Sequence, residues 1–383
     1  MSNRSIPESS QLSANTPADM RSHNRRVILH ALRLHGSLSR AELARTTGLT
    51  PQAVANIVEG LEAAGLVRQA GRRRSSRGQP PIEIEISKDG GYALGIRVDD
   101  SHLLAVAVNL VGEVIETRRD ARLPRDTGEW VDYVAEIHVG FAERHNVDRC
   151  LGVGIVTPGP FDVDWPGIPS PGSVRALQSR NIVERIALRT GVDVFLENDA
   201  TAAAIGERLY GEAKDVNNFF YVFVGEGVGG GIVIRGQPYR GFRGNAGEFG
   251  HIIVDPAGPQ CYCGNKGCLG EYLSLASMRQ SLGPDFDLSD GNHPDFTRWI
   301  LQAAQALSVG LASVENLFDP EIVIIGGTAP TWMLNRLVEA LGTLRPSVRQ
   351  DGGQQRLRLS KLGEESGALG AAALPILAAT SSV

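Results

Sequence analysis

The sequence of 383 residues predicts an α/β protein in which an N-terminal winged helix-turn-helix precedes a larger, two-lobed α/β body. Three short amphipathic segments followed by two strands predict the first domain, in residues 21–88, and alternating strand and helix patterns predict the second, in residues 89–383. Charge is divided in the same way. Residues 1–80 hold twelve arginines, no lysine and five acids, which gives a net charge of +7. Because the whole chain has a net charge of −5, the remaining residues carry −12. Such a division is typical of a basic domain that contacts polyanions and an acidic body that does not.

The composition, 42% apolar and 21% charged, is that of a globular protein and excludes a fibrous or membrane-spanning class. The longest apolar run, in residues 367–380, is shorter than the ~20 residues that a bilayer span requires. The N-terminal residues lack the hydrophobic segment of a signal peptide. One isolated Cys150 and a tight group of three cysteines do not form an even disulfide framework. We therefore expect a cytoplasmic protein with no membrane contact.

The first domain begins with an arm and two helices. Residues 1–20 are rich in Ser, Pro and Asn without an apolar period, which predicts a disordered arm. Apolar residues on one face predict a first helix in residues 25–36. Ser39 and Glu42 form a capping box, so a second helix is predicted to begin at residue 40 and to stop at the glycine at residue 48.

A third helix and a hairpin complete the predicted first domain. Thr50 is placed as an N-cap, and Pro51 suits the first helical position. A short strand after Gly65, the loop GRRRSSRGQPP and the alternating sequence IEIEI then predict a β-hairpin with a basic tip. Three helices and such a hairpin are the pattern of a winged helix-turn-helix.

The basic hairpin tip favours double-stranded operator DNA as a partner. The alternative is a helical protein-interaction module with a solvated basic loop. Four arginines on the tip favour DNA, because cationic side chains gain affinity by releasing counterions from phosphates. Gln52 and Asn56, polar residues near the start of the third helix, are predicted to pair with base edges in the major groove.

The remaining DNA contacts are assigned to residues outside the third helix, because that helix has no basic side chain. The segment RGQP at residues 77–80 is a compact turn that we expect to lie in a narrow minor groove with A·T-rich flanks. The predicted DNA-binding residues are Arg40, Arg45, Gln52, Asn56, Arg72, Arg73, Arg74, Arg77 and Gln79.

Repeated hairpins predict that the acidic body is duplicated. Residues 95–118 have the pattern strand, turn, strand, turn, strand, and residues 221–239 repeat the theme about 130 residues later. Two lobes with a cleft between them are an arrangement that clamps nucleotide phosphates, although glycine-rich turns alone are also typical of tight hairpins. Asn198 and Asp199 begin a predicted helix, and residues 320–327 form a buried strand that runs into a glycine turn.

One histidine and three cysteines in the body are spaced as metal ligands. They follow the pattern H-x9-C-x-C-x4-C, and they are His251, Cys261, Cys263 and Cys268. One nitrogen and three sulfurs suit a structural Zn²⁺ ion in tetrahedral geometry. Gly264 and Gly267 allow the loop to turn back on itself. The alternative, three unpaired thiols, is disfavoured because clustered thiols without a metal are prone to oxidation.

These segments resemble the ROK family of repressors, open reading frames and sugar kinases, specifically its transcriptional-regulator branch. The resemblance spans nearly the whole chain after residue 20, and its most specific parts are ENDA at 197–200, GEFGH at 247–251 and CYCGNKGC at 261–268. It implies an actin-like (ribonuclease H-like) body that binds a sugar between its lobes beside a zinc ion. In regulators it also implies a homodimer or homotetramer that presents two DNA-binding heads.

The two expected phosphate loops depart from those of the family's kinases. The kinases have Asp followed by Gly-Gly-Thr in the first loop, whereas residues 97–101 here have the sequence RVDDS. A Thr is usual between the first two glycines of the second loop, whereas this chain has Glu226. Carboxylates that face phosphates repel them by on the order of a kilocalorie or more each. We therefore expect no kinase activity and no enzyme.

The resemblance also implies a set of sugar contacts, at Asn198, Asp199, Glu248 and His251. Asp199 resembles the catalytic base of the kinases, and we expect it here to accept a hydrogen bond from a sugar hydroxyl. Gly172 stands where the family often has Asn, and Gly270 where a sugar-binding Glu is common. Glu271, one residue later, is kept as a candidate substitute. Both glycines remove side-chain volume from the expected sugar pocket. The pocket could therefore accept a bulkier or substituted sugar, bind sugar weakly, or bind no sugar.

Together these features predict a sugar-responsive transcriptional regulator that represses genes for carbohydrate uptake or catabolism. A sugar or sugar derivative would alter lobe closure and the placement of two winged helices on a pseudo-palindromic operator. A coupling of ~1–3 kcal/mol between effector and DNA suffices for such a switch. Two alternatives stay open: a ROK-type sugar kinase with a DNA-binding head, and a regulator controlled by a protein partner in which the sugar cleft is vestigial.

Overall fold

The chain forms two compact units, Met1–Ser87 with Leu377–Val383, and Lys88–Ile376. The first is the N-terminal unit and the second is the body, and each is described by itself. The computed structural model describes residues 17–72, 81–99, 102–145, 149–160, 172–179, 181–283, 286, 291, 293–349 and 356–382.

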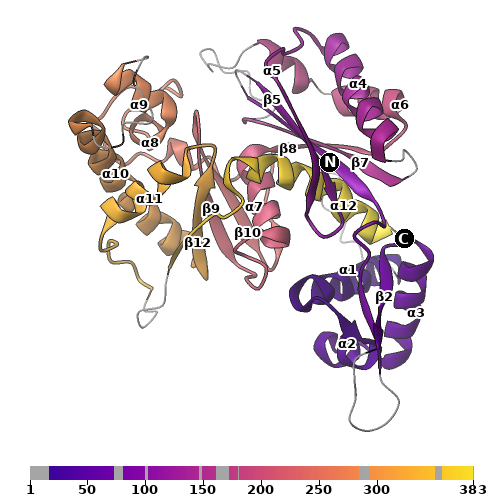
Figure 1. Ribbon diagram of the computed structural model, residues 1–383. Coiled ribbons are helices and arrows are strands. Elements are labelled where there is room, and N and C mark those ends of the chain that lie inside the picture. The colour runs from indigo at the N-terminus through magenta and orange to yellow at the C-terminus, as the bar shows by residue number, and fades with distance from the viewer. Residues whose placement is uncertain are drawn as a thin grey trace, which may run out of the picture. The chain divides into compact units, whose positions relative to one another are not determined.

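The N-terminal unit combines helices with a small antiparallel sheet (Figure 1). Its described helices are α1 (Pro17–His35), α2 (Arg40–Thr47) and α3 (Pro51–Ala63). Its described strands are β1 (Leu38–Ser39), β2 (Val67–Arg72) and β3 (Ile82–Ile86), in the order β1-β3-β2. The hairpin of β2 and β3 is the predicted wing, while its tip, residues 73–80, lies outside the described residues.

Local hydrogen bonds set the ends of α2 and α3 as the sequence predicts. The Ser39 side chain accepts from the Glu42 N–H, and the Glu42 carboxylate accepts in return from the Ser39 N–H at 2.8 Å. Gly48 ends α2 with a φ of 71°, a value that favours glycine. The Thr50 hydroxyl accepts from the Ala53 N–H at 3.2 Å. These contacts confirm the capping box and the N-cap.

The first helix begins earlier than the sequence analysis expects. It starts at Pro17, inside the expected arm of residues 1–20, and residues 1–16 lie outside the described part of the chain. Proline is favourable in the first helical turn because its φ already suits the helix and it has no N–H to leave unpaired. A proline-led start therefore extends the helix into a segment that has no apolar period.

The described body contains two five-stranded sheets with the same topology. The first has the order β6-β5-β4-β7-β8 and consists of β4 (Tyr92–Val98), β5 (Leu103–Asn109), β6 (Val114–Asp120), β7 (Cys150–Thr157) and β8 (Val194–Asn198). The second has the order β11-β10-β9-β12-β13 and consists of β9 (Phe219–Val224), β10 (Val228–Ile234), β11 (Gln237–Pro238), β12 (Ile322–Gly327) and β13 (Leu357–Leu359). In both, an antiparallel meander is followed by two parallel strands, which confirms the predicted duplication.

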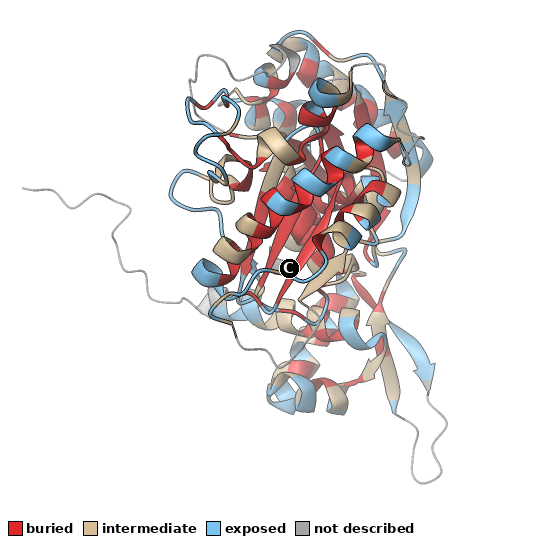
Figure 2. Ribbon diagram, turned by 90° about the vertical axis from the view of Figure 1, so that its left-hand side faces the viewer, coloured by how far each residue is buried: buried red, intermediate tan, exposed pale blue. Residues whose placement is uncertain are grey.

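Helices pack on both faces of these sheets (Figure 1). The first sheet carries α4 (Thr127–His145), α5 (Gly172–Leu177) and α6 (Ile182–Thr190), and the second carries α8 (Gly270–Leu273), α9 (Leu275–Leu282), α10 (Pro294–Phe318) and α11 (Thr331–Leu341). Figure 2 shows the buried residues concentrated in the strands and in the helix faces turned toward them. None of the helices in the described ranges has the length and apolar character needed to cross a membrane.

Two further helices, α7 (Asp199–Tyr210) and α12 (Ser366–Ser382), meet the sheets through backbone contacts. A Cβ added at Gly154 of β7 would lie 1.9 Å from the carbonyl oxygen of Ala371 in α12. Gly231 of β10 makes the same kind of contact with the first turn of α7. A Cβ at Gly370 of α12 would lie 1.8 Å from the carbonyl oxygen of Ala202 in α7. Only glycine permits these approaches, so the two helices join the two halves of the body at backbone distance.

The substitution Gly154→Ala is expected to destabilise the body by about 3 kcal/mol, because the new methyl group must push α12 away from β7. A matched control is Gly140→Ala in α4, where an added Cβ meets nothing closer than 3.9 Å. That change should be neutral or stabilise by roughly 0.5–1 kcal/mol, because alanine favours a helix over glycine. Urea titration of both variants measures the difference, and equal effects would contradict the packing argument.

Candidate functional site

The junction of β8 and α7 holds two of the polar side chains that the sequence singles out. Asn198 caps α7, and its side-chain oxygen accepts from the N–H groups of Ala200 at 2.9 Å and Thr201 at 3.2 Å. Asp199 is the first helical residue, and its carboxylate accepts from the Ala200 N–H at 2.8 Å. The strand end and the helix start therefore fix both side chains at the N-terminus of α7.

Glu248 reaches this junction from the second half of the body. It directly precedes a short 3₁₀ helix, η3 (Phe249–His251). A Cβ built on Gly159, just after β7, would lie 2.9 Å from Asn198 Nδ2 and 3.5 Å from Glu248 Oε1. Three segments that are distant in sequence thus meet at one place, and the absent side chain at residue 159 leaves their polar groups facing one another.

The two carboxyl groups at this place have raised pKa values. Burial raises the pKa of Asp199 to about 6 and the pKa of Glu248 to about 7. The charge of Asp199 adds to the shift of Glu248, while the guanidinium of Arg97 lowers the pKa of Asp199 in part. Closely spaced carboxyl groups and an amide offer hydrogen bonds to the hydroxyls of a neutral polar ligand.

An ion pair that the sequence analysis missed supports the same junction. Glu197, directly before Asn198, is buried, and its carboxylate lies 2.6 Å from Nε of Arg240, which follows β11. Its other oxygen accepts from the Asn198 N–H at 3.0 Å. No local pattern connects Glu197 with Arg240, because 43 residues separate them. The pair ties β8 of the first half to the second half, beside Asn198 and Asp199.

The predicted metal ligands His251, Cys261, Cys263 and Cys268 come together, with ligand atoms that all lie within 4.8 Å of one another. Cys261 Sγ is 3.6 Å from His251 Nδ1, and Cys263 Sγ is 3.5 Å from Cys268 Sγ. Two sulfurs bound to one tetrahedral Zn²⁺ at about 2.3 Å lie about 3.8 Å apart. The cluster therefore fits a four-coordinate ion with only small adjustments.

A tight turn presents the cysteines of this cluster. The Cys261 N–H donates to the carbonyl oxygen of Asn265 at 2.8 Å. Gly264 and Gly267 have φ values of 91° and 68°, which confirms that the turn needs glycine at both places. All three cysteines are buried, and burial raises the pKa of Cys268 to about 11. A bound cation would offset the cost of ionising such buried thiols, so the donor set fits a metal ion.

His251 has a second partner, Tyr262, that the sequence analysis missed. Tyr262 Oη lies 2.9 Å from His251 Nε2, on the opposite side of the ring from the Nδ1 atom that faces Cys261. Burial lowers the pKa of His251, so its imidazole is neutral at neutral pH, as a metal ligand must be. The position of Tyr262 between two cysteine ligands was the available signal for this contact.

Gly270 and the candidate sugar contact Glu271 are the first two residues of α8. A Cβ on Gly270, the first residue of α8, would lie 3.3 Å from the Gly250 carbonyl oxygen, a tight contact. Burial raises the pKa of the Cys261 thiol, and the nearby Glu271 carboxyl adds to the shift. Glu271 therefore lies beside the metal ligands. Gly172 begins α5, and residues 161–171 before it lie outside the described residues.

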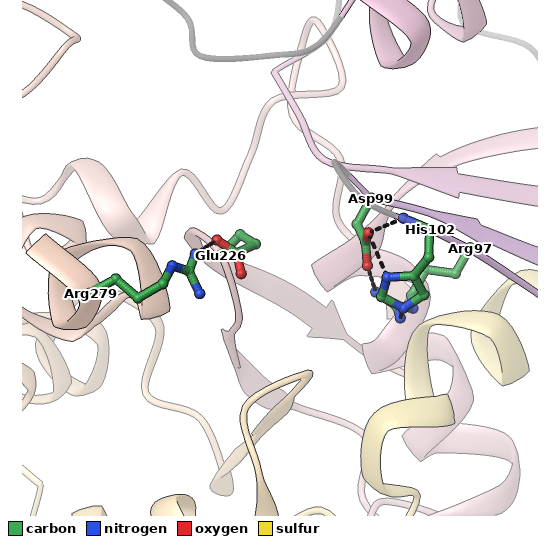
Figure 3. A network of polar contacts seen from close by, with 5 residues as sticks. All are labelled: Arg97, Asp99, His102, Glu226 and Arg279. Carbon is green, nitrogen blue, oxygen red and sulfur yellow. Dashed lines mark hydrogen bonds and ion pairs between the residues drawn. The ribbon is translucent and has the colours of Figure 1, made fainter. Parts of the chain in front are cut away.

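Both predicted phosphate loops carry ion pairs (Figure 3). After β4, Asp99 lies 2.8 Å from Arg97 Nη1 and 3.1 Å from His102 Nδ1. Between β9 and β10, Glu226 pairs with Arg279 of α9. The expectation of carboxylates directed at phosphates is corrected here for Asp99 and Glu226, because arginines of β4 and α9 neutralise them. Asp100 and Ser101 lie outside the described residues.

The predicted DNA-binding residues are partly within the described structure. Gln52 and Asn56 are exposed on α3, and Gln52 Nε2 donates to Asn56 Oδ1 at 2.9 Å. Arg45 is exposed in the last turn of α2, whereas Arg40 pairs with Glu62 of α3 at 3.0 Å. The backbone of Arg72 ends β2. The predicted residues outside the described part of the chain are Arg73, Arg74, Arg77 and Gln79.

Comparison with known proteins yields relatives for both units. The chain is 28% identical to the xylose repressor of Bacillus spizizenii over 374 residues, which is 92% of this chain and 94% of the repressor. A crystal structure of a ROK family transcriptional regulator, a homologue of the Escherichia coli MLC protein, superposes with a TM-score of 0.75 at 25% identity, over 95% of this chain and 97% of that one. A ROK family glucokinase from Streptomyces griseus, in complex with glucose and AMPPNP, gives a TM-score of 0.60 at 26% identity over 74% of this chain and 99% of the kinase.

Family models match both parts of the chain. The MarR family model matches residues 25–78, which contain part of α1, all of α2 and α3, and the first strand of the wing hairpin, β2. The ROK family model matches residues 93–377, which contain both sheets and the junction of Asn198, Asp199 and Glu248. The expected winged helix-turn-helix and actin-like body are thereby confirmed. Since the second match covers well over half of the sequence, the chain belongs to the ROK family.

Proposed function

We propose that the protein is a carbohydrate-responsive transcriptional repressor, in which the winged helix-turn-helix binds operator DNA and the body binds the effector. The observation that carries this proposal is the meeting of Asn198, Asp199 and Glu248 beside the metal-binding loop, in a chain that begins with a DNA-binding fold. Similarity to a xylose repressor over nearly the whole chain supports it. The effector class is a sugar or sugar derivative, because carboxylates and an amide suit hydroxyl donors.

Operator recognition is assigned to α3 and to the basic side chains around it. The hydrogen bond between Gln52 and Asn56 restricts both side chains before DNA binds, and it leaves the Gln52 oxygen and the Asn56 amide hydrogens for base edges. Arg45 and the arginines of the wing would contact phosphates. Two such heads, in a homodimer or homotetramer, would fit the half-sites of a pseudo-palindromic operator.

The metal is proposed to be a structural Zn²⁺ held by His251, Cys261, Cys263 and Cys268. A site with four protein ligands has no open position for catalysis, so the ion would act on the fold of the loop. Glu248 directly precedes η3, and His251, three residues later, is the last residue of η3. Fixing His251 to the metal would therefore also fix the segment that carries Glu248 to the effector.

Kinase activity is not part of the proposal, although a kinase of the family superposes on the body. The carboxylates of Asp99 and Glu226 are already paired with Arg97 and Arg279. A nucleotide would have to break these pairs and would then face the released carboxylates. The chain's own ion pairs thus oppose phosphate binding in these loops.

The function is tested by selecting bound DNA from a genomic pool and repeating the selection with D-xylose, D-glucose and N-acetyl-D-glucosamine. We expect a recurrent operator whose binding changes with at least one sugar. Asp199→Asn should keep operator affinity but weaken that sugar's affinity by about 10- to 100-fold, because it removes a charged acceptor worth roughly 1.5–3 kcal/mol. Failure of the wild-type protein to retain any fragment at low salt contradicts the proposal.

The effector response should also depend on pH. The pKa values of Asp199, about 6, and Glu248, about 7, lie above the usual carboxyl range. In the ligand-free protein both groups favour folding below about pH 4, and this contribution is lost as the pH rises through 6 to 7. The ionised carboxylates are the stronger acceptors, so sugar affinity measured by calorimetry should rise between pH 5.5 and 7.5. Asp199→Asn with Glu248→Gln should flatten the profile.

Asn56→Ala is expected to weaken operator binding by about 1–3 kcal/mol and to relax the sequence preference at one base pair. Arg45→Ala, the matched control, should weaken binding to all sequences alike and lower its salt dependence. Binding titrations against the operator and its single-base variants at two salt concentrations measure both effects. Equal losses on all sequences for Asn56→Ala would remove this residue from base recognition.

A coupled ADP-release assay with ATP, Mg²⁺ and the same sugars should show no turnover by the wild-type protein. Glu226→Gln should raise ATP affinity by about tenfold, since it removes one carboxylate and frees Arg279 for a phosphate. Arg279→Met is the control, because it breaks the same ion pair without freeing a cation. Sustained sugar phosphorylation by the wild-type protein would replace the proposal with the kinase alternative.

A further inference from the structure

The loop of residues 240–246, which follows β11 and precedes Glu248, presents an aromatic side chain to solvent. Phe242 is 95% exposed, the largest exposed fraction of any large apolar side chain in the described part of the chain. Gly241 and Gly244 bend the backbone beside it, with φ values of 71° and 79°. A ring in this position leaves its apolar surface in water, so the fold itself gains almost nothing from it.

The loop has a fixed base and an open tip. At the base, the Ala246 N–H donates to the carbonyl oxygen of Arg240 at 3.0 Å, which closes the loop. The Gly230 N–H of β10 donates to the Gly247 carbonyl oxygen at 2.7 Å, so the end of the loop lies against β10. At the tip, by contrast, a Cβ added at Gly244 would meet no atom within 4 Å. The tip can therefore move while the base stays in place.

Both ends of this base adjoin the polar junction assigned to the effector. On one side, Arg240 pairs at 2.6 Å with Glu197, which directly precedes Asn198. On the other side, the loop leads after one residue to Glu248. A Cβ on Gly159 would lie 2.9 Å from Asn198 Nδ2 and 3.5 Å from Glu248 Oε1, so the two ends approach the same place. The loop therefore starts and ends beside the polar groups that would hold a sugar.

A carbohydrate needs two kinds of contact. Its hydroxyls can bond to Asn198, Asp199 and Glu248, but these polar groups do not cover the C–H groups of the sugar ring. Phe242 is two residues from Arg240, and two residues span at most about 7 Å, so the ring is held near the junction. An aromatic ring laid over the C–H groups would remove apolar surface of both partners from water.

We propose that Phe242 is a further effector-binding residue, and that the tip of its loop folds over a bound pyranose so that the phenyl ring covers the C–H face of the sugar. The inference rests on the proposed function and adds an apolar contact to its hydrogen bonds. Gly241 and Gly244 allow the tip to change direction, because glycine adopts both signs of φ. The ion pair of Arg240 with Glu197 holds the base of the loop during this movement.

The first test is calorimetric titration of the wild-type protein and Phe242→Ala with D-xylose, D-glucose and N-acetyl-D-glucosamine. Loss of the ring should weaken the affinity of the responsive sugar about five- to tenfold. Leu188→Ala is the matched control, because Leu188 of α6 is also a large apolar side chain and is 87% exposed. It should keep sugar affinity within twofold of the wild-type value. Both side chains are exposed, so neither change should lower the melting temperature by more than about 2 °C.

The second test reports the movement of the ring itself. Tryptophan emission shifts to shorter wavelength when the indole leaves water, so Phe242→Trp should show this shift on saturation with the responsive sugar. Leu188→Trp should show none, and the wild-type protein corrects for the tryptophans already present.

Three results would overturn the inference and leave the proposed function standing. They are an affinity of Phe242→Ala within twofold of the wild-type value, equal losses in Phe242→Ala and Leu188→Ala, and an emission of Phe242→Trp that the sugar does not change. A wild-type protein that binds none of the sugars would contradict the proposed function and this inference together.

Discussion

The body depends on direct backbone contact between small residues of α7, α12 and the two sheets. Gly154 lets α12 lie against β7, Gly231 lets α7 lie against β10, and Gly370 lets the two helices touch each other. Each sheet is therefore joined to the other through a pair of helices rather than through strand pairing. Because an added methyl group cannot be accommodated at these places, the distance between the halves is fixed by the backbone and not by adaptable side chains.

The polar junction follows from this constraint. Asp199 is the first residue of one of the two connecting helices, so its place relative to both sheets is set when α7 packs. Glu248 arrives from the second half, and the ion pair of Glu197 with Arg240 ties the halves beside it. The loop that carries the proposed metal ligands would add a further restraint through His251. Two carboxyl groups that repel each other are thus held close by the packing of α7 and by the ion pair beside them.

The sequence predicted those features whose partners lie within a few residues. The caps at Ser39 and Thr50 and the turn at Gly264 are determined locally, and the metal cluster was predictable because three ligands fall within eight residues. It did not predict the partners of Glu226 or Glu197, which lie 53 and 43 residues away and meet only in the folded chain. Counting carboxylates in the phosphate loops therefore overstated their negative charge. A residue count records charge, whereas only the fold records which charges are already paired.

That distinction bears on what the body binds. Asp99 and Glu226 are already paired with arginines. A further cation or a ligand hydroxyl that contacted either carboxylate would therefore gain little free energy. Asp199 and Glu248 are different, because burial and mutual repulsion raise their pKa values to about 6 and 7. Such groups are stabilised most by a ligand that brings hydrogen-bond donors without negative charge. A neutral polyhydroxylated ligand meets that condition and a phosphorylated one does not, so the charges at this junction favour the binding of a neutral sugar.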